Sequence, residues 1–143
     1  MSLAWLGRSS PLSHLPIAFF PECVSAGFPS PAEGYEDHAL DLNELCIQRP
    51  AATYFVRVEG ESMRGVAIMP GDILVVDRSI APRHGDVVVA AVYGEFTVKE
   101  LQLTPSAALI AHHNDYPPIA LDGEGDGEIF GVATSVVRQL RYG

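Results

Sequence analysis

The chain has 143 residues, of which 48% are hydrophobic and 19% are charged, and its formal net charge is -9. That length suffices for one domain with its own core, and the composition is typical of a globular chain. Only 9 basic residues accompany 18 acidic ones, which argues against a domain that grips nucleic acid by neutralising phosphates. We therefore expect no direct sequence-specific DNA binding.

The cysteines and the apolar runs bear on where the protein works. Cys23 and Cys46 lie in different segments and form no metal-binding spacing, so reduced thiols and a cytoplasmic location are expected. No apolar run approaches the ~18 residues that cross a bilayer. The sequence therefore predicts no membrane partner.

Residues 1–50 are predicted to form a flexible N-terminal arm. The stretch shows no sustained period of 2 or 3.6, and it contains Pro11, Pro16, Pro21, Pro29, Pro31 and Pro50. Prolines fix the backbone and remove donors, which favours an extended chain. For 24–32, a disordered linker and a strand laid across another surface both remain open. Apolar residues at 40, 42, 45 and 47 indicate a short helical turn.

Residues 51–143 are predicted to form a β domain. Runs rich in β-branched and aromatic residues indicate strands at 53–58, 72–77, 85–92, 95–103, 107–112 and 128–140. Glycines and prolines separate these runs, and Tyr93-Gly94 is typical of a tight turn. The fold class expected is therefore mostly β, with antiparallel sheets or a partly open barrel.

Ser62 and Lys99 are the candidate catalytic residues. Ser62 follows Gly60 at the end of a predicted strand, and a glycine there allows a turn that exposes the hydroxyl. Lys99 lies within a strand among apolar residues, where desolvation would lower its pKa and suit it to act as a base. From the residues alone, a structural turn serine and a surface lysine remain open as interpretations.

No metal or cofactor site is expected. His112 and His113 are adjacent and would point to opposite faces of a strand, which makes them a poor metal pair. The acidic stretch 122–128 has the alternating carboxylates of a calcium loop, but Ala133 stands where the bidentate glutamate should be. A solvated turn is the better interpretation.

Several blocks of sequence, in order, resemble the LexA/UmuD family of Ser–Lys self-cleaving proteins, with its UmuD-like members as the nearer match. The blocks are Ala26-Gly-Phe-Pro-Ser-Pro31, Ala52-Thr-Tyr-Phe-Val56, Gly60-Glu-Ser-Met63, Gly71-Asp-Ile-Leu-Val-Val-Asp77, His84-Gly-Asp-Val-Val-Val-Ala90 and Gly94-Glu-Phe-Thr-Val-Lys-Glu-Leu101. Together they span roughly residues 26–101. The order of the blocks makes a plain structural β domain an improbable alternative.

The resemblance implies a LexA-type peptidase fold and a serine endopeptidase that cuts its own chain. Ser62 would be the nucleophile and Lys99 the general base, with the scissile bond at Ala26-Gly27. The backbone amides of Glu61 and Ser62 would hold the oxyanion. The family further implies a homodimer, stimulation by the RecA filament on single-stranded DNA, and a UmuC-like Y-family polymerase subunit as partner in translesion synthesis.

Two departures and two rival functions accompany this resemblance. Residues 64–69 lack the acidic residue that relatives often carry after the Ser-Met pair, and only 26 residues precede the expected bond. The second point favours a polymerase accessory over a DNA-binding repressor. The rivals are a non-catalytic module of the same fold that regulates a polymerase by binding only, and a processing peptidase like bacterial signal peptidase.

Overall fold

In the computed structural model of the protein, residues 2–8, 17–18, 39–121 and 127–141 are described, and all structural statements concern these residues. Eight strands form one antiparallel sheet: β1 (Ser2–Arg8), β4 (Thr53–Glu59), β5 (Ile73–Asp77), β6 (Val87–Val92), β7 (Glu95–Gln102), β8 (Ala108–Ile110), β9 (Ile119–Ala120) and β10 (Gly127–Val137). A separate pair is formed by β2 (Ile17–Ala18) and β3 (Ala39–Leu40). The remaining elements are the helix α1 (Leu42–Cys46) and the 3-10 turns η1 (Pro50–Ala52) and η2 (Arg64–Val66).

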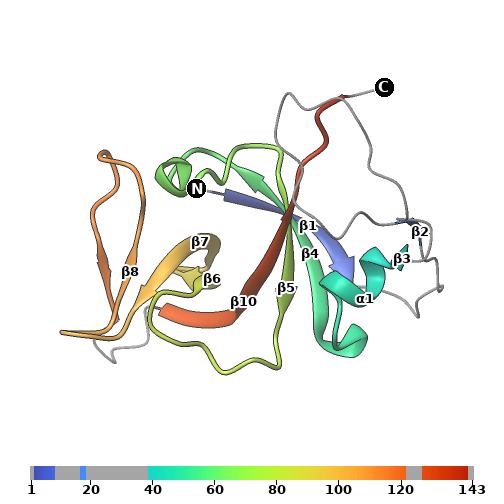
Figure 1. Ribbon diagram of the computed structural model, residues 1–143. Helices are drawn as coiled ribbons and strands as arrows, with labels where there is room; N and C mark the ends of the chain where they lie inside the picture. The colour runs from blue at the N-terminus through green and yellow to red at the C-terminus, as the bar shows by residue number, and fades with distance from the viewer. Residues whose placement is uncertain (1, 9–16, 19–38, 122–126, 142–143) are drawn as a thin grey trace.

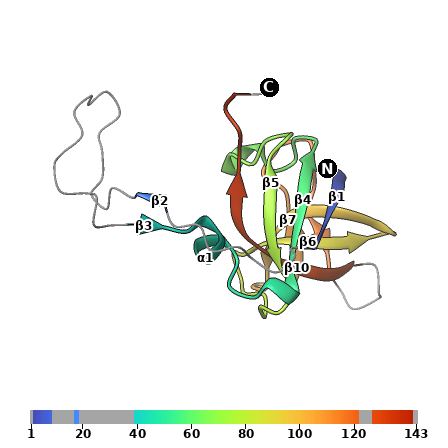
Figure 2. The same cartoon turned by 90° about the vertical axis from the view of Figure 1, so that its right-hand side faces the viewer.

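The large sheet is strongly curved but not closed. Its strand order is β1-β4-β5-β10-β6-β7-β8-β9, so β1 and β9 are its two ends and do not pair with each other. The curvature nevertheless brings β1 against β7, although the two strands are far apart in the strand order (Figure 2). Figure 1 shows β10 crossing the middle of the molecule between β5 and β6. The predicted fold class, mostly β with a partly open barrel, is confirmed.

Most strand positions follow the predicted runs to within two residues, although β6 begins at Val87 instead of 85, and the early ends of β8 and β10 have a physical reason. The turn between β6 and β7 is confirmed, because Tyr93 and Gly94 both adopt positive φ, at 51° and 81°. β8 ends at Ile110 instead of 112, since the next residues turn away to contact another loop. β10 ends at Val137 instead of 140, because the chain leaves the sheet at Arg138 to bind a buried carboxylate.

The core consists of two groups of buried apolar side chains. The first, which includes Val56, Val58, Met63 and Val98, lies between β4, β6 and β7. The second includes Val88, Leu101 and Leu109 on β6, β7 and β8. Because β7 contributes to both groups, it is held firmly on either side.

The N-terminal 50 residues are described only in part. β1 pairs with β4, and the helical turn expected in 40–47 is present as α1, with the Asp41 side chain accepting from the Asn43 amide at its start. Ala26, Gly27 and Cys23 lie outside the described residues, and the boundary at residue 50 stays a prediction.

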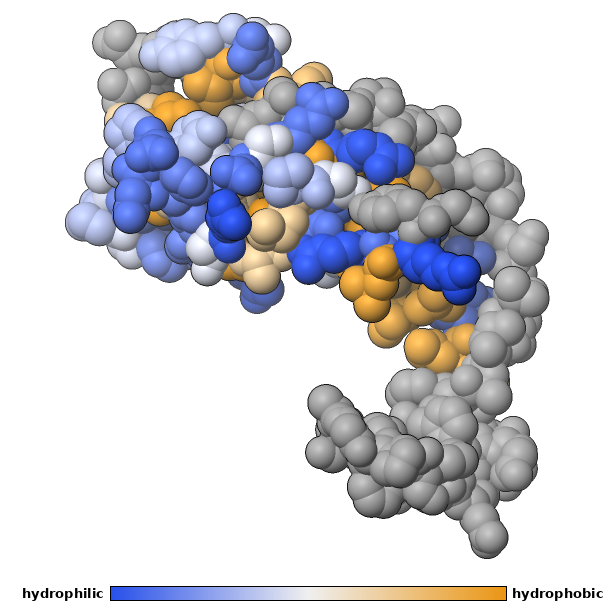
Figure 3. Space-filling model, turned by 90° about the horizontal axis from the view of Figure 1, so that it is seen from above, coloured by the Kyte–Doolittle hydropathy of each residue, from blue (hydrophilic) through white to orange (hydrophobic). Residues whose placement is uncertain are grey.

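One face of the described part of the molecule is predominantly polar (Figure 3). Figure 3 shows one face on which hydrophilic residues dominate and hydrophobic ones gather in smaller clusters. Exposed apolar side chains do occur on α1 and at the end of β10, namely Leu42, Leu45, Val136 and Val137. Within the described ranges, no helix has the length and apolar character that a membrane crossing requires.

Candidate active site

Ser62 is positioned by the strand before it and by the residue after it. β4 ends at Glu59, and Gly60 then adopts a φ of 85°, which reverses the chain. Met63, which has no exposed surface, inserts its side chain into the core beside Val56 and Val58. The hydroxyl of Ser62 is therefore fixed between a glycine turn and a buried anchor, and Ser62 itself is 0% exposed.

Lys99 reaches Ser62 from β7, 37 residues further along the chain. Its Nζ lies 3.2 Å from the Ser62 Oγ, 2.6 Å from the Thr97 Oγ1 and 3.2 Å from the carbonyl oxygen of Val98. Because side chains alternate along a strand, Thr97 and Lys99 share one face of β7. The structure thus brings together the two residues expected to be catalytic.

Burial changes the acid–base behaviour of this lysine. Lys99 is 3% exposed, and none of its hydrogen-bond partners in the described part of the chain is charged. Desolvation disfavours the ammonium form and lowers the pKa of Lys99 below its ordinary value. A buried lysine without a carboxylate partner is suited to accept a proton.

The three contacts of Nζ match the bonding capacity of a neutral amine. Such an amine has two N–H donors and one lone pair. Two of the neighbours, the Thr97 hydroxyl oxygen and the Val98 carbonyl, can accept the two N–H bonds. The lone pair then faces the Ser62 hydroxyl, which is the arrangement in which Lys99 can withdraw its proton.

A second segment holds the backbone of the Ser62 loop. The amide of His112 donates to the Ser62 carbonyl at 2.6 Å, and the amide of Gly65 donates to the His112 carbonyl at 2.7 Å. A Cβ on Gly65 would lie 2.8 Å from that same carbonyl oxygen. Only glycine permits so close an approach, so Gly65 and His112 together clamp the loop.

The other side of this loop is tied to the end of β10. Both carboxylate oxygens of Asp72 accept hydrogen bonds from Arg138 at 2.6 Å, and the Arg138 guanidinium also donates to the Ala67 carbonyl at 2.7 Å. Asp72 in turn accepts from the Met69 amide at 2.9 Å. The Arg138 contact is the main cause that holds the pKa of the buried Asp72 below its ordinary value.

A groove leads away from Lys99. It has a volume of about 510 Å³ and is lined by Val92, Phe96, Thr97, Lys99, Tyr116 and Ile119, among others. The Tyr116 ring lies 5.9 Å from the Lys99 Nζ. The groove is mostly apolar and open at one side, which suits the side chains of an extended peptide.

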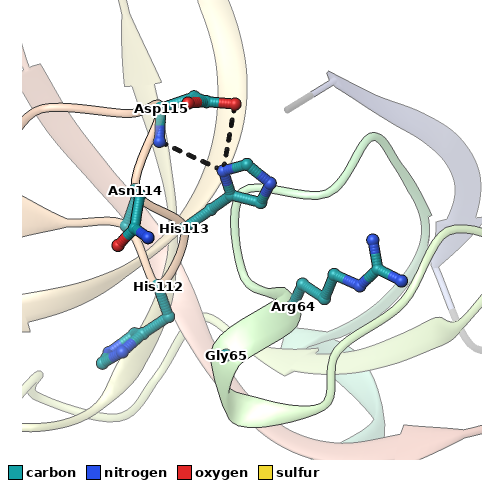
Figure 4. Close-up of a pocket in the computed structure, with 7 residues that line it drawn as sticks. Arg64, Gly65, His112, His113, Asn114 and Asp115 are labelled. Carbon is teal, nitrogen blue, oxygen red and sulfur yellow. Dashed lines mark hydrogen bonds and ion pairs between the residues drawn. The ribbon is translucent and has the colours of Figure 1, made fainter.

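A polar pocket of about 680 Å³ lies beside the Ser62 loop, between Arg64 and residues 111–115 (Figure 4). Its two histidines point in different directions: His113 approaches the carboxylate of Asp115, whereas His112 approaches that of Glu100 at 3.3 Å. Within the described ranges, no three His, Cys, Asp or Glu side chains converge as a metal site would require.

Residues beyond the predicted pair also shape the site. Thr97 stands two residues before Lys99, so strand alternation places it on the same face as the lysine, and this spacing was the signal by which its role could have been found. The contributions of Gly65 and His112 had no local signal, because they depend on a contact between distant loops. No carbonyl of the described residues accepts from the Glu61 or Ser62 amide.

Comparison with known proteins gives consistent matches. The sequence model of the family described as Peptidase S24-like matches residues 18–134. Protein MucA of Salmonella typhimurium is 49% identical over 119 residues, which cover 82% of each chain. Protein SamA of Salmonella typhimurium strain LT2 is 47% identical over 122 residues, 85% of each chain. Protein ImpA of Shigella flexneri is 48% identical over 122 residues, 85% of this chain and 83% of ImpA.

Proposed function

The chain belongs to the Peptidase S24-like family as a UmuD-like, self-cleaving serine peptidase of SOS mutagenesis, and from that premise we propose that it cuts its own Ala26-Gly27 bond. Ser62 is the nucleophile and Lys99 the general base. The observation that carries this assignment is the 3.2 Å contact between the Lys99 Nζ and the Ser62 Oγ, both deeply buried.

The proposed reaction has two stages. The Ser62 Oγ attacks the carbonyl carbon of Ala26 while Lys99 takes the hydroxyl proton, and the amides of Glu61 and Ser62 stabilise the oxyanion. Lys99 then gives the proton to the Gly27 nitrogen as the peptide bond breaks. Water hydrolyses the Ser62 ester, which leaves a carboxylate on Ala26 and restores the hydroxyl.

The biological setting proposed follows from the UmuD-like relatives. We infer that the RecA filament on single-stranded DNA promotes cleavage in the cytoplasm, and that the shortened homodimer serves a UmuC-like Y-family polymerase in translesion synthesis. The net charge of -9 supports recruitment through proteins instead of direct DNA contact. The alternative function is a module of the same fold that regulates a polymerase by binding only. Such a module would never cut its own chain.

Intact mass measurement tests the proposal. The purified chain is incubated at neutral and alkaline pH, alone and with RecA, nucleotide and single-stranded DNA, beside Ser62→Ala and Lys99→Ala. We expect a product that begins at Gly27 in the parent chain only. Cleavage in Ser62→Ala would contradict the nucleophile. An unchanged parent mass even with the filament would favour the binding module.

A further inference from the structure

The first strand of the chain lies between the strand that leads into the Ser62 loop and the strand that bears Lys99. β4 leads directly into the Ser62 loop, and β7 bears Lys99, yet β4 and β7 do not pair with each other. β1 pairs with the edge of β4 and also lies against β7 (Figure 2). It therefore occupies the space that separates the strand of the nucleophile from the strand of the base.

The register places one end of β1 close to the nucleophile. Ser2 pairs with Glu59, the last residue of β4, and Ser62 follows only three residues later. At its other end β1 reaches Tyr54, so the strand covers the outer edge of β4 along most of its length. The inner edge of β4 is paired with β5, which leaves β1 as the element that covers the remaining edge.

The catalytic groups are almost wholly buried in this arrangement, although Lys99 lines one end of the groove described above. Ser62 is 0% exposed and Lys99 is 3% exposed. A peptide bond must bring its carbonyl carbon into contact with the Ser62 Oγ before reaction, so some element has to move. An extended peptide gains its binding from backbone hydrogen bonds to a free strand edge, and one edge of β4 cannot serve two strands at once.

We propose that the edge of β4 facing β7 is a peptide-binding edge, and that β1 occupies it as a competitor of the substrate segment. Residues 2–8 thus hold the peptidase in a closed state until they leave the edge. This inference rests on the proposed self-cleavage, and it adds that the strand before the cleavage segment governs access to Ser62.

The pairing of β1 is suited to being reversible. The ladder has an irregular point, because its register shifts between Trp5 and Gly7, which disrupts the hydrogen bonds there. β1 is also a terminal strand of the sheet order, with a pairing partner on one side only. Edge strands open more readily than central ones.

The test compares rates of self-cleavage at alkaline pH. One variant lacks residues 2–8, and another carries Leu3→Pro with Ala4→Pro. Neighbouring N–H groups of a strand point to opposite sides, so this pair removes a ladder bond whichever residue faces β4. Ser9→Pro, just beyond β1, is the matched control. We expect at least a fivefold faster first-order rate in both β1 variants, and the parent rate in Ser9→Pro.

Adding the missing strand in trans should reverse the effect. A synthetic peptide of residues 2–8, given to the deletion variant, is expected to return its rate toward that of the parent chain. A peptide of the same composition in scrambled order should act more weakly. Parent-like rates in both β1 variants, with melting temperatures close to that of the parent, would overturn the proposal.

Amide hydrogen exchange provides a readout that does not require cleavage. In the Ser62→Ala background, the outward-facing amides of β4 should be protected in the full chain and should exchange at least tenfold faster without residues 2–8. Equal exchange would overturn the role of β1. If no form of the chain ever cleaves, the proposed function fails, while this measurement still decides whether β1 occupies the edge.

Discussion

The Lys99 amine lies closer to Thr97 than to the serine it is expected to activate. The Nζ to Oγ1 distance on β7 is 2.6 Å, against 3.2 Å from Nζ to the Ser62 Oγ. Thr97 and the Val98 carbonyl together fix the direction of the amine, and so decide where its lone pair points. This positioning role leads to the first of four predictions.

Thr97→Val keeps the shape of the side chain and removes the hydroxyl acceptor. We expect self-cleavage to slow by about tenfold, which corresponds to the loss of one hydrogen bond worth about 1.4 kcal/mol. An ammonium uses such an acceptor more strongly than a neutral amine. The rate should therefore begin to rise at a lower pH than in the parent. Thr97→Ser, which keeps the hydroxyl, should restore both rate and profile; an unshifted profile in Thr97→Val would contradict the argument.

The pH dependence of cleavage should follow the neutral fraction of Lys99. Burial lowers the pKa of this lysine below the ordinary value of 10.5. The rate should therefore increase about tenfold per pH unit below the folded pKa and level off above it. First-order rates measured between neutral and alkaline pH check this expectation. Lys99→Arg, which stays protonated, should show no such rise, and a flat profile in the parent chain would rule out Lys99 as the base.

Gly65→Ala should impair the nucleophile through the backbone. The new Cβ would lie 2.8 Å from the His112 carbonyl oxygen, so the clamp on the Ser62 loop must open. We expect at least a tenfold slower cleavage, together with a stability loss of about 1–3 kcal/mol.

The matched control for this substitution is Gly131→Ala. Its Cβ would meet the Val76 side chain at 2.8 Å, on β10 and β5 instead of the catalytic loop. A similar loss of stability with a cleavage rate close to the parent value is expected there. Equal slowing in both variants, after correction for the folded fraction, would show that Gly65 has no special role.

Arg138→Gln should destabilise the fold in a pH-dependent way. Asp72 is 1% exposed, and its folded pKa is lowered chiefly by the hydrogen bond from Arg138. A lowered carboxylate pKa gives stability that is present above the unfolded value of about 3.8 and is lost as the pH falls through the folded value. The variant should lose about 3 kcal/mol at neutral pH and little at strongly acid pH.

Urea unfolding at neutral and acid pH measures this difference. Arg141→Gln, which alters an exposed arginine three residues later, is the control and should match the parent at both pH values. If Arg138→Gln lost the same stability at both pH values, the ion pair with Asp72 would not be the cause.

The sequence by itself determined the local elements and the candidates for the reacting residues. The turn at Tyr93-Gly94 requires positive φ, and β-branched runs specify strands, so both are encoded by immediate neighbours. The blocks around Ser62 and Lys99 identified the pair because the motifs stand in order along the chain. Strand periodicity also placed Thr97 on the face of Lys99.

Only the tertiary structure decided whether these residues could react. Lys99 is buried because β7 packs against both groups of core side chains. The polar and apolar residues of β7 do not alternate regularly enough for the sequence to reveal that burial. The Asp72 carboxylate meets Arg138 across 66 residues, and Gly65 meets His112 between two loops. Such contacts arise when the sheet curls, because packing of the whole core fixes the distance between segments that no local pattern relates.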